Sequence, residues 1–128
     1  MSSLQHKIDF AVVISVKNAN PNGDPLNGNR PRMSYEGYGE ISDVCLKRKI
    51  RNRLLDMGQA IFVQSDDKCI DGCHSLLERA RTCPEYKKVK GKDEEAFTRA
   101  ACKTWIDVRS FGQVFAFQTD KVSIGVRG

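Results

Sequence analysis

The sequence predicts a soluble α+β protein. Apolar residues alternate with a period of two near the N-terminus, two later segments have helical patterns with capping signals, and a glycine-spaced segment near the C-terminus has the character of a strand. Of the 128 residues, 40% are hydrophobic and 8% are aromatic, which is typical of one globular domain with a modest core. This composition excludes a disordered tail.

The segment KIDFAVVISVK, residues 7–17, is expected to form the first strand. Every second residue of this segment is apolar, and in a strand these residues share one face: Ile8, Phe10, Val12, Ile14 and Val16. Ala11 and Val13 make the middle of the segment apolar on the other face as well. The pattern therefore indicates a central strand that is covered on at least one side, and Pro21 ends it because proline donates no ladder hydrogen bond.

Residues 42–57 are expected to form a helix. Ser42 is a candidate N-cap, and Gly58 can adopt the left-handed conformation that ends a helix. The apolar side chains fall on two arcs of this helix, with Leu46, Ile50, Leu54 and Met57 on one and Val44 and Leu55 on the other. Lys47 and Arg51 lie between these arcs. Charges within an apolar surface break the usual pattern, and such breaks often mark function.

The remaining sequence is expected to add a strand, a polar insertion, a helix and a further strand. Residues 59–64 have the pattern of a short strand, and residues 65–92 are polar, with a short helix near residues 73–81. A helix begins at Asp93, where three acidic residues occupy the first turn. The later apolar residues are expected to pack in the core: Trp105, Phe111, Val114, Phe115 and Phe117. Trp105 and Phe111 have a second interpretation as rings that stack on bases, but their helical spacing favours the core. VSIGVRG then resembles the start of a strand, and we expect the chain to be the N-terminal portion of a longer protein.

The charge distribution favours an acidic partner such as nucleic acid. Basic residues number 21 and acidic residues 16, which gives a net charge of +5. The basic helix segment, residues 44–55, contains five cations and no acid: Lys47, Arg48, Lys49, Arg51 and Arg53. The five cysteines do not form the even-numbered framework of a secreted protein, and neither a signal peptide nor a membrane-spanning run is present. We therefore expect a cytoplasmic protein.

The stretch NANPNGDPLNGNRPR, residues 18–32, has two interpretations. It lacks the bidentate glutamate of a calcium loop and the Gly-Lys-Ser/Thr of a phosphate-binding P-loop, so it is either a turn-rich connection or an anion-binding loop. Exposed amides in glycine- and asparagine-rich turns form concavities for anions, and arginines can fork onto phosphates. The candidate RNA-binding residues of the loop are Asn18, Asn20, Asn27, Gly28, Asn29, Arg30 and Arg32.

The basic helix segment is either a solvated surface or a second part of the same site. Lys47 and Arg51 lie one turn apart on one flank, with Arg48 beside them, while Lys49 and Arg53 lie on the opposite flank. We favour Lys47, Arg48 and Arg51 as the residues that contact RNA. In the third interpretation, the basic helix contacts acidic residues of a neighbouring subunit.

Other chemistry has little support in the sequence. Cys69, Cys73 and His74 resemble part of a zinc site, but their spacing is unusual and no second ligand pair follows. No triad of nucleophile, histidine and acid is visible. Asp24 is a lone carboxylate in the loop, where a metal-dependent ribonuclease would place one, and it is the basis of the alternative function.

These segments together resemble a known family. The order of an apolar strand, NPNGDPLNGNRPR, SDVCLKRKIRNRL and later WIDVRSFGQVFAF is similar to the backbone subunit of type I-C CRISPR Cascade, the Cas-seven (Csd-two) family of RNA-binding RAMP proteins. The resemblance covers nearly the whole chain and about the first half of a family member. Lys47, Arg48, Arg51 and the loop would then line the RNA groove.

The resemblance implies a modified RRM (ferredoxin-like) palm that is incomplete in this chain. Residues 1–64 would hold its N-terminal part, residues 65–104 a finger-like insertion, and residues 105–128 the return to the palm. Copies would polymerise along the crRNA, bind its sugar-phosphate backbone irrespective of sequence and leave its bases free to pair with target DNA in antiviral defence. The implied partners are crRNA, target DNA through the guide, other copies and other Cascade subunits. The resemblance implies no catalysis, cofactor, metal or membrane.

Overall fold

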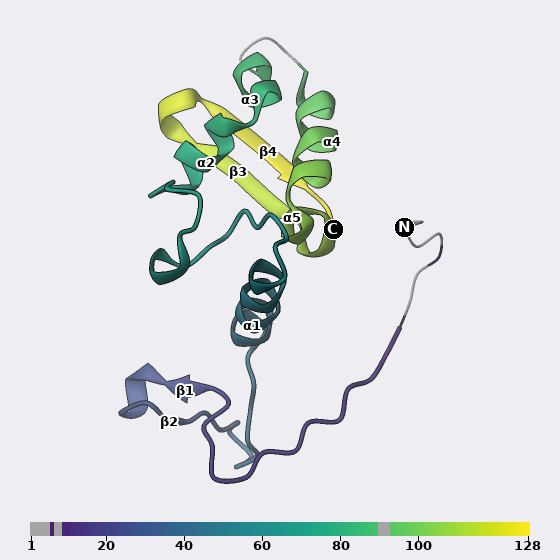
Figure 1. Ribbon diagram of the computed structural model, residues 1–128. Coiled ribbons are helices and arrows are strands. Elements are labelled where there is room, and N and C mark those ends of the chain that lie inside the picture. Colours follow the sequence, from purple (N-terminus) through teal and green to yellow (C-terminus); the bar gives the residue numbers. More distant parts are fainter. Residues whose placement is uncertain (1–5, 7–8, 90–92) are drawn as a thin grey trace. The chain divides into compact units, whose positions relative to one another are not determined.

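The computed structural model describes residue 6 and residues 9–89 and 93–128, and it confirms the α+β class (Figure 1). The chain divides into two compact units, Met1–Asp43 and Val44–Gly128, which are described separately. Within the described ranges, no helix is long and apolar enough to cross a membrane.

The first unit contains a short hairpin. Strand β1 (Gly23–Asp24) pairs antiparallel with β2 (Arg30–Pro31), and the 3-10 turn η1 (Pro25–Asn27) connects them. Asp24 caps η1, because its carboxylate accepts a hydrogen bond from the Leu26 amide at 3.0 Å. The hairpin thus uses the turn residues that the loop sequence supplies.

The strand predicted at residues 7–17 does not form in the part of the chain that the structure describes. Residues 7 and 8 lie outside the described residues, and residues 9–16 are exposed, with the Val13 side chain fully open at 97%. A strand needs a neighbour to accept and donate its backbone hydrogen bonds. Both sheets of the described residues are two-stranded hairpins made by other segments, so the prediction of a covered central strand is wrong here.

Helix α1 (Asp43–Asp56) confirms the predicted helix, and Gly58 adopts the expected positive φ of 76° beyond its end. The orientation of the helix differs from the expected one. Leu55 is buried and Arg51 is largely covered, whereas Met57, on the predicted apolar arc, is 61% exposed. Within the second unit, the helix therefore packs against the rest of the unit through the side that carries Arg51 and Leu55.

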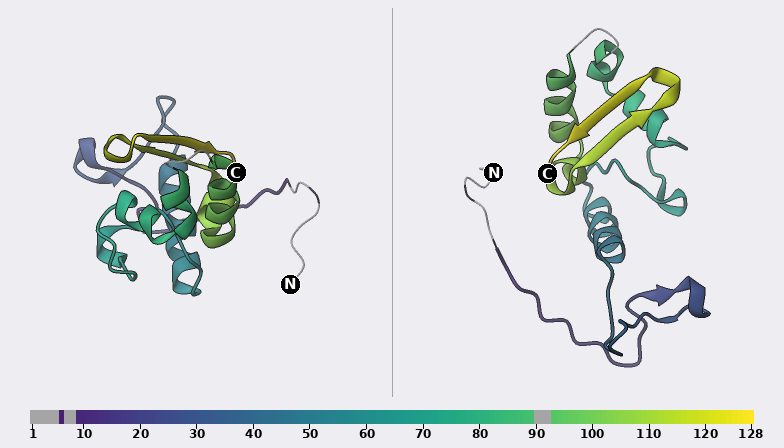
Figure 2. Two further views of the ribbon diagram at one scale, coloured as in Figure 1. Left: turned by 90° about the horizontal axis from the view of Figure 1, so that it is seen from above. Right: turned by 180° about the vertical axis from the view of Figure 1, so that it is seen from behind.

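The second unit is built on the hairpin of β3 (Gln113–Phe117) and β4 (Val122–Val126), in which Phe115 pairs with Ile124. The turn between the two strands is η4 (Gln118–Asp120). The remaining helices are α2 (Leu76–Thr82), α3 (Pro84–Lys88), α4 (Glu94–Thr104) and α5 (Ile106–Phe111), and a 3-10 turn, η2 (Asp66–Lys68), precedes them. These helices gather on one face of the hairpin (Figure 2), which confirms the predicted helices near residues 73–81 and after Asp93 and the strand after Val122.

Aromatic rings fill the core between the hairpin and the helices. The Phe115 ring is fully buried, with its centroid 4.8 Å from that of Phe62 and 4.9 Å from that of Phe97. Trp105 is also buried, as predicted. Val114 was expected in the core but is 64% exposed, because alternation along β3 turns it to the face opposite Phe115.

The segment predicted as a second strand, residues 59–64, is not a strand. The backbone amides and carbonyls of Phe62 and Val63 bond to charged side chains instead of a neighbouring strand. The Asp107 carboxylate accepts from the amides of Phe62 and Val63 at 2.7 and 3.0 Å. Arg79 donates to the Phe62 carbonyl at 2.9 Å, and Arg48 donates to the Val63 carbonyl at 2.7 Å. Three charged residues therefore satisfy the backbone groups that a neighbouring strand would otherwise pair.

Candidate nucleic-acid interface

In the first unit, the asparagines of the loop hold its own backbone in place. The Asn20 side-chain amide donates to the Asn29 backbone carbonyl at 2.8 Å. The Asn22 side-chain oxygen accepts from both the backbone amide and the hydroxyl of Ser42, each at 2.9 Å. Asn18, Gly28 and Asn29 have positive φ values between 52° and 58°. Asparagine and glycine tolerate this conformation. The composition of the loop thus has a structural cause, which leaves its RNA-binding role a prediction.

The two arginines of the loop differ in their surroundings. Arg30 is exposed, whereas Arg32 forms an ion pair with Glu40 at 3.0 Å, with both side chains less than half exposed. Asn27 is exposed in the turn between the strands. The Asp24 carboxylate caps η1, a structural role that gives no support to a catalytic one. Among the described residues, no group of three or more His, Cys, Asp or Glu side chains is arranged to hold a metal ion.

In the second unit, the three cations favoured on helix α1 occupy different environments. Arg48 donates to the Val63 carbonyl and so helps to anchor the segment after the helix. The Arg51 side chain is 13% exposed, and its Nε lies 3.0 Å from the Asp107 carboxylate. The Lys47 ammonium lies over the Phe111 ring, 5.6 Å from its centroid. Lys47 and Arg51 of α1 therefore both contact Phe111 of α5, whereas Arg48 contacts the segment that follows α1.

Lys47 and Arg51 open onto a shallow cavity of about 630 Å³ between α1 and the ends of the hairpin. The residues that line it are Lys47, Arg51, Phe111, Gly112, Gln113, Val114, Val126, Arg127 and Gly128. The side chains of this lining, which we call the cationic cavity, include three cations and no carboxylate. Asp107 lies beneath it and compensates part of the positive charge from the buried side.

Sequence reasoning missed two residues of this site. Arg127 follows β4, far from the basic helix segment in the sequence, and only the return of the hairpin brings it beside α1. Asp107 was assigned no role from the sequence. A signal was present in the segment Asp107–Phe111, where an acid and an aromatic residue one helical turn apart can hold one cation between them.

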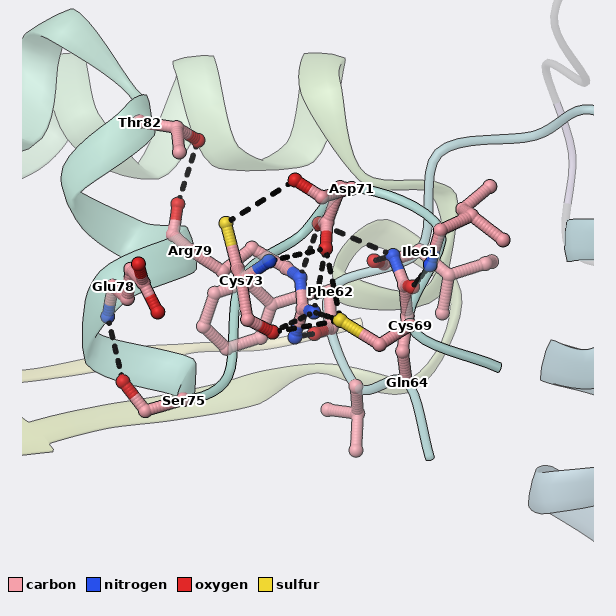
Figure 3. Close-up of polar contacts among 12 residues, drawn as sticks. Ile61, Phe62, Gln64, Cys69, Asp71, Cys73, Ser75, Glu78, Arg79 and Thr82 are labelled. Carbon is pink, nitrogen blue, oxygen red and sulfur yellow. Dashed lines mark hydrogen bonds and ion pairs between the residues drawn. The ribbon is translucent and has the colours of Figure 1, made fainter. Parts of the chain in front are cut away.

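A second polar network surrounds the cysteines near α2 (Figure 3). The buried Arg79 guanidinium forms a two-pronged ion pair with Asp71, at 2.6 and 2.9 Å, and donates to the Cys73 carbonyl at 3.0 Å. The Cys69 thiol also donates to that carbonyl, at 2.9 Å. Burial raises the pKa of the Cys73 thiol, which disfavours the thiolate that a zinc ligand requires. The network therefore orders the chain between residues 61 and 79.

The fold and the site define an α+β protein with a cationic surface formed by one helix and the end of a hairpin. Comparison with known proteins gives the family. The family model of CRISPR-associated protein Cas7 matches residues 6–128. A protein of Haloferax volcanii named CRISPR-associated protein Cas7 is 32% identical over 121 residues, which are 88% of this chain and 33% of that protein. The chain belongs to the Cas7 family of CRISPR-associated proteins, and it spans about a third of the length of this relative.

Proposed function

We propose that the chain is part of a backbone subunit of a type I-C CRISPR Cascade, which binds the sugar-phosphate backbone of crRNA without reading its sequence. The observation that carries this proposal is the cationic cavity in a chain of the Cas7 family. Phosphates dominate the affinity of such sites, while base edges carry sequence information. A shallow surface with three cations, and with one aromatic ring already covered by two of them, suits a phosphate better than a base.

The assembly follows from the same proposal. Copies of the subunit line up along the crRNA in the cytoplasm, contact other Cascade subunits and present the guide bases to target DNA. The palm is of the RRM type, with residues 1–64 and 105–128 contributing to it and residues 65–104 forming the finger-like insertion. The loop residues Asn18, Asn20, Asn27, Gly28, Asn29, Arg30 and Arg32 form the second contact to the RNA. Catalysis is not part of this function, and the ribonuclease alternative is not favoured because Asp24 caps a turn.

Charge reversal of Lys47 is expected to weaken RNA binding far more than charge reversal of Lys49. Lys47 lines the cationic cavity, whereas Lys49 is exposed on the same helix, 200° further around its axis, and is absent from that lining. The two variants, Lys47→Glu and Lys49→Glu, have the same net charge, so long-range electrostatic effects on binding are matched. Fluorescence anisotropy with a labelled single-stranded RNA measures both dissociation constants. Equal losses of affinity would show that the helix acts only through its total charge, and would refute this site.

A further inference from the structure

Asp107 is a charged residue of α5 that is almost completely buried. Its side chain is 1% exposed, and its two oxygens accept three hydrogen bonds, from the Phe62 amide, the Val63 amide and Nε of Arg51. A buried carboxylate is costly unless it is paired and fully hydrogen-bonded. Two backbone amides alone would leave this charge without a counterion. Arg51 supplies the counterion, so the positions of the two side chains are coupled.

Asp107 and Phe111 hold the Arg51 guanidinium at two points. Asp107 binds Nε, and the Phe111 ring, one turn further along α5, lies under the guanidinium with 5.0 Å between Cζ and the ring centroid. Neither terminal nitrogen of Arg51 is bonded to any other described residue, and neither is buried without a partner. Arg51 also lines the cationic cavity, so an anion that enters the cavity comes within reach of this side chain.

Arg48 provides a comparison on the same helix. Its Nη1 donates to the Val63 carbonyl at 2.7 Å, so one of its terminal nitrogens serves the protein backbone. In Arg51, Nε donates to the Asp107 carboxylate, and the two terminal nitrogens lie side by side with no bond to the backbone of the described residues. Two parallel N–H groups are the part of a guanidinium that matches two oxygens of a phosphate. The arrangement around Arg51 therefore suits an anion in the cavity, and the one around Arg48 does not.

We propose that Asp107 is a positioning residue that, through Nε, fixes the Arg51 guanidinium so that its two terminal nitrogens bind one phosphate of a single-stranded RNA in the cationic cavity. The proposal rests on the proposed function and deepens it, because it assigns the phosphate contact to Arg51 with Lys47 and Arg127 beside it. Holding the side chain in place before the ligand arrives reduces the conformational entropy lost on binding. The contribution of Asp107 to affinity is therefore expressed only through Arg51.

A double-mutant cycle on RNA affinity tests this dependence. Asp107→Asn is expected to weaken binding of a labelled single-stranded RNA about tenfold, or about 1.4 kcal/mol, because the neutral side chain has one accepting oxygen for three donors and no charge to hold the guanidinium. In an Arg51→Ala background the same substitution is expected to change the affinity less than about twofold, since the two residues act as one unit. Equal losses in both backgrounds, or no loss in the wild-type background, would overturn the proposal.

Controls separate positioning from general destabilisation. Asp120 is another buried carboxylate; it pairs with Arg81 at 2.7 Å and does not line the cavity. Asp120→Asn is therefore expected to lower the melting temperature. At temperatures where this variant is folded, its RNA affinity should equal that of the wild type. If Asp107→Asn does not fold, Phe111→Leu replaces it in the cycle, because it removes the second point of support and leaves the carboxylate. A wild-type chain that is folded and binds no RNA would refute the proposed function itself. If the wild type binds RNA and the losses of affinity caused by Asp107→Asn and Arg51→Ala add up in the double variant, only the role of Asp107 would be refuted.

Discussion

Replacement of Arg79 by methionine is expected to lower the free energy of unfolding by about 3–5 kcal/mol, the usual cost of breaking a buried ion pair by removing one partner. Arg79 is 4% exposed and joins three parts of the chain. It pairs with Asp71, donates to the Phe62 carbonyl and donates to the Cys73 carbonyl. Methionine fills part of the volume but removes the guanidinium, which leaves the buried side of Asp71 without its counterion and the Phe62 carbonyl without its donor. Urea unfolding followed by circular dichroism measures the loss.

The acid dependence of stability isolates the Asp71 part of this network. Hydrogen bonds from Arg79 hold the pKa of Asp71 well below its ordinary value of 3.8, against the opposing effect of burial. A carboxylate with a lowered pKa stabilises the fold above the pKa of the unfolded state and loses that contribution as the pH falls below it. The stability difference between wild type and Asp71→Asn should therefore be constant above about pH 5 and shrink below about pH 4. A difference that persists unchanged at pH 2.5 would contradict this role of the ion pair.

Phe115→Ala is expected to cost about 3–5 kcal/mol of unfolding free energy, because it opens a cavity at the centre of the aromatic core. The ring is fully buried against Phe62, Phe97 and Trp105, which come from three different segments of the second unit. Thermal and urea unfolding of the variant measure the loss.

The adjacent residue provides the matched control for this prediction. Val114 precedes Phe115 in the same strand and is exposed on the opposite face of the hairpin. Val114→Ala is therefore expected to change the unfolding free energy by no more than about 0.5 kcal/mol. If the two variants were equally destabilised, the assignment of the core to the Phe115 face would be wrong.

Local signals in the sequence predicted three of the helices, α1, α2 and α4. The N-terminal signal at Ser42 and the glycine at residue 58 frame α1, and Asp93 caps α4 as its position suggested, since its side chain accepts from the Ala96 amide at 3.0 Å. These signals depend on residues within one turn of each other. The class of the fold and the helices α1, α2 and α4 were therefore readable from the sequence, whereas α3 and α5 were not predicted.

The strands and the site depended on distant residues and were predicted less well. The apolar alternation of residues 9–16 does not identify a partner strand, and none pairs with it among the described residues. The apolar run at residues 61–63 gave no sign that Arg48, Arg79 and Asp107 would satisfy its backbone. In the same way, the periodicity of α1 identified Lys47 and Arg51 as exceptions but not the carboxylate and ring that hold Arg51.

In the function proposed above, this chain binds the phosphates of RNA and does not read its bases. The most direct test is anisotropy binding of the wild-type chain to two unrelated single-stranded RNAs of equal length, between about 50 and 200 mM salt. We expect equal affinity for both RNAs and a slope of log K against log salt of about −2 or steeper, since each of three cations contributes about −0.7 on a single strand. A marked preference for one sequence, a slope near zero, or no binding by a chain that melts cooperatively would contradict it.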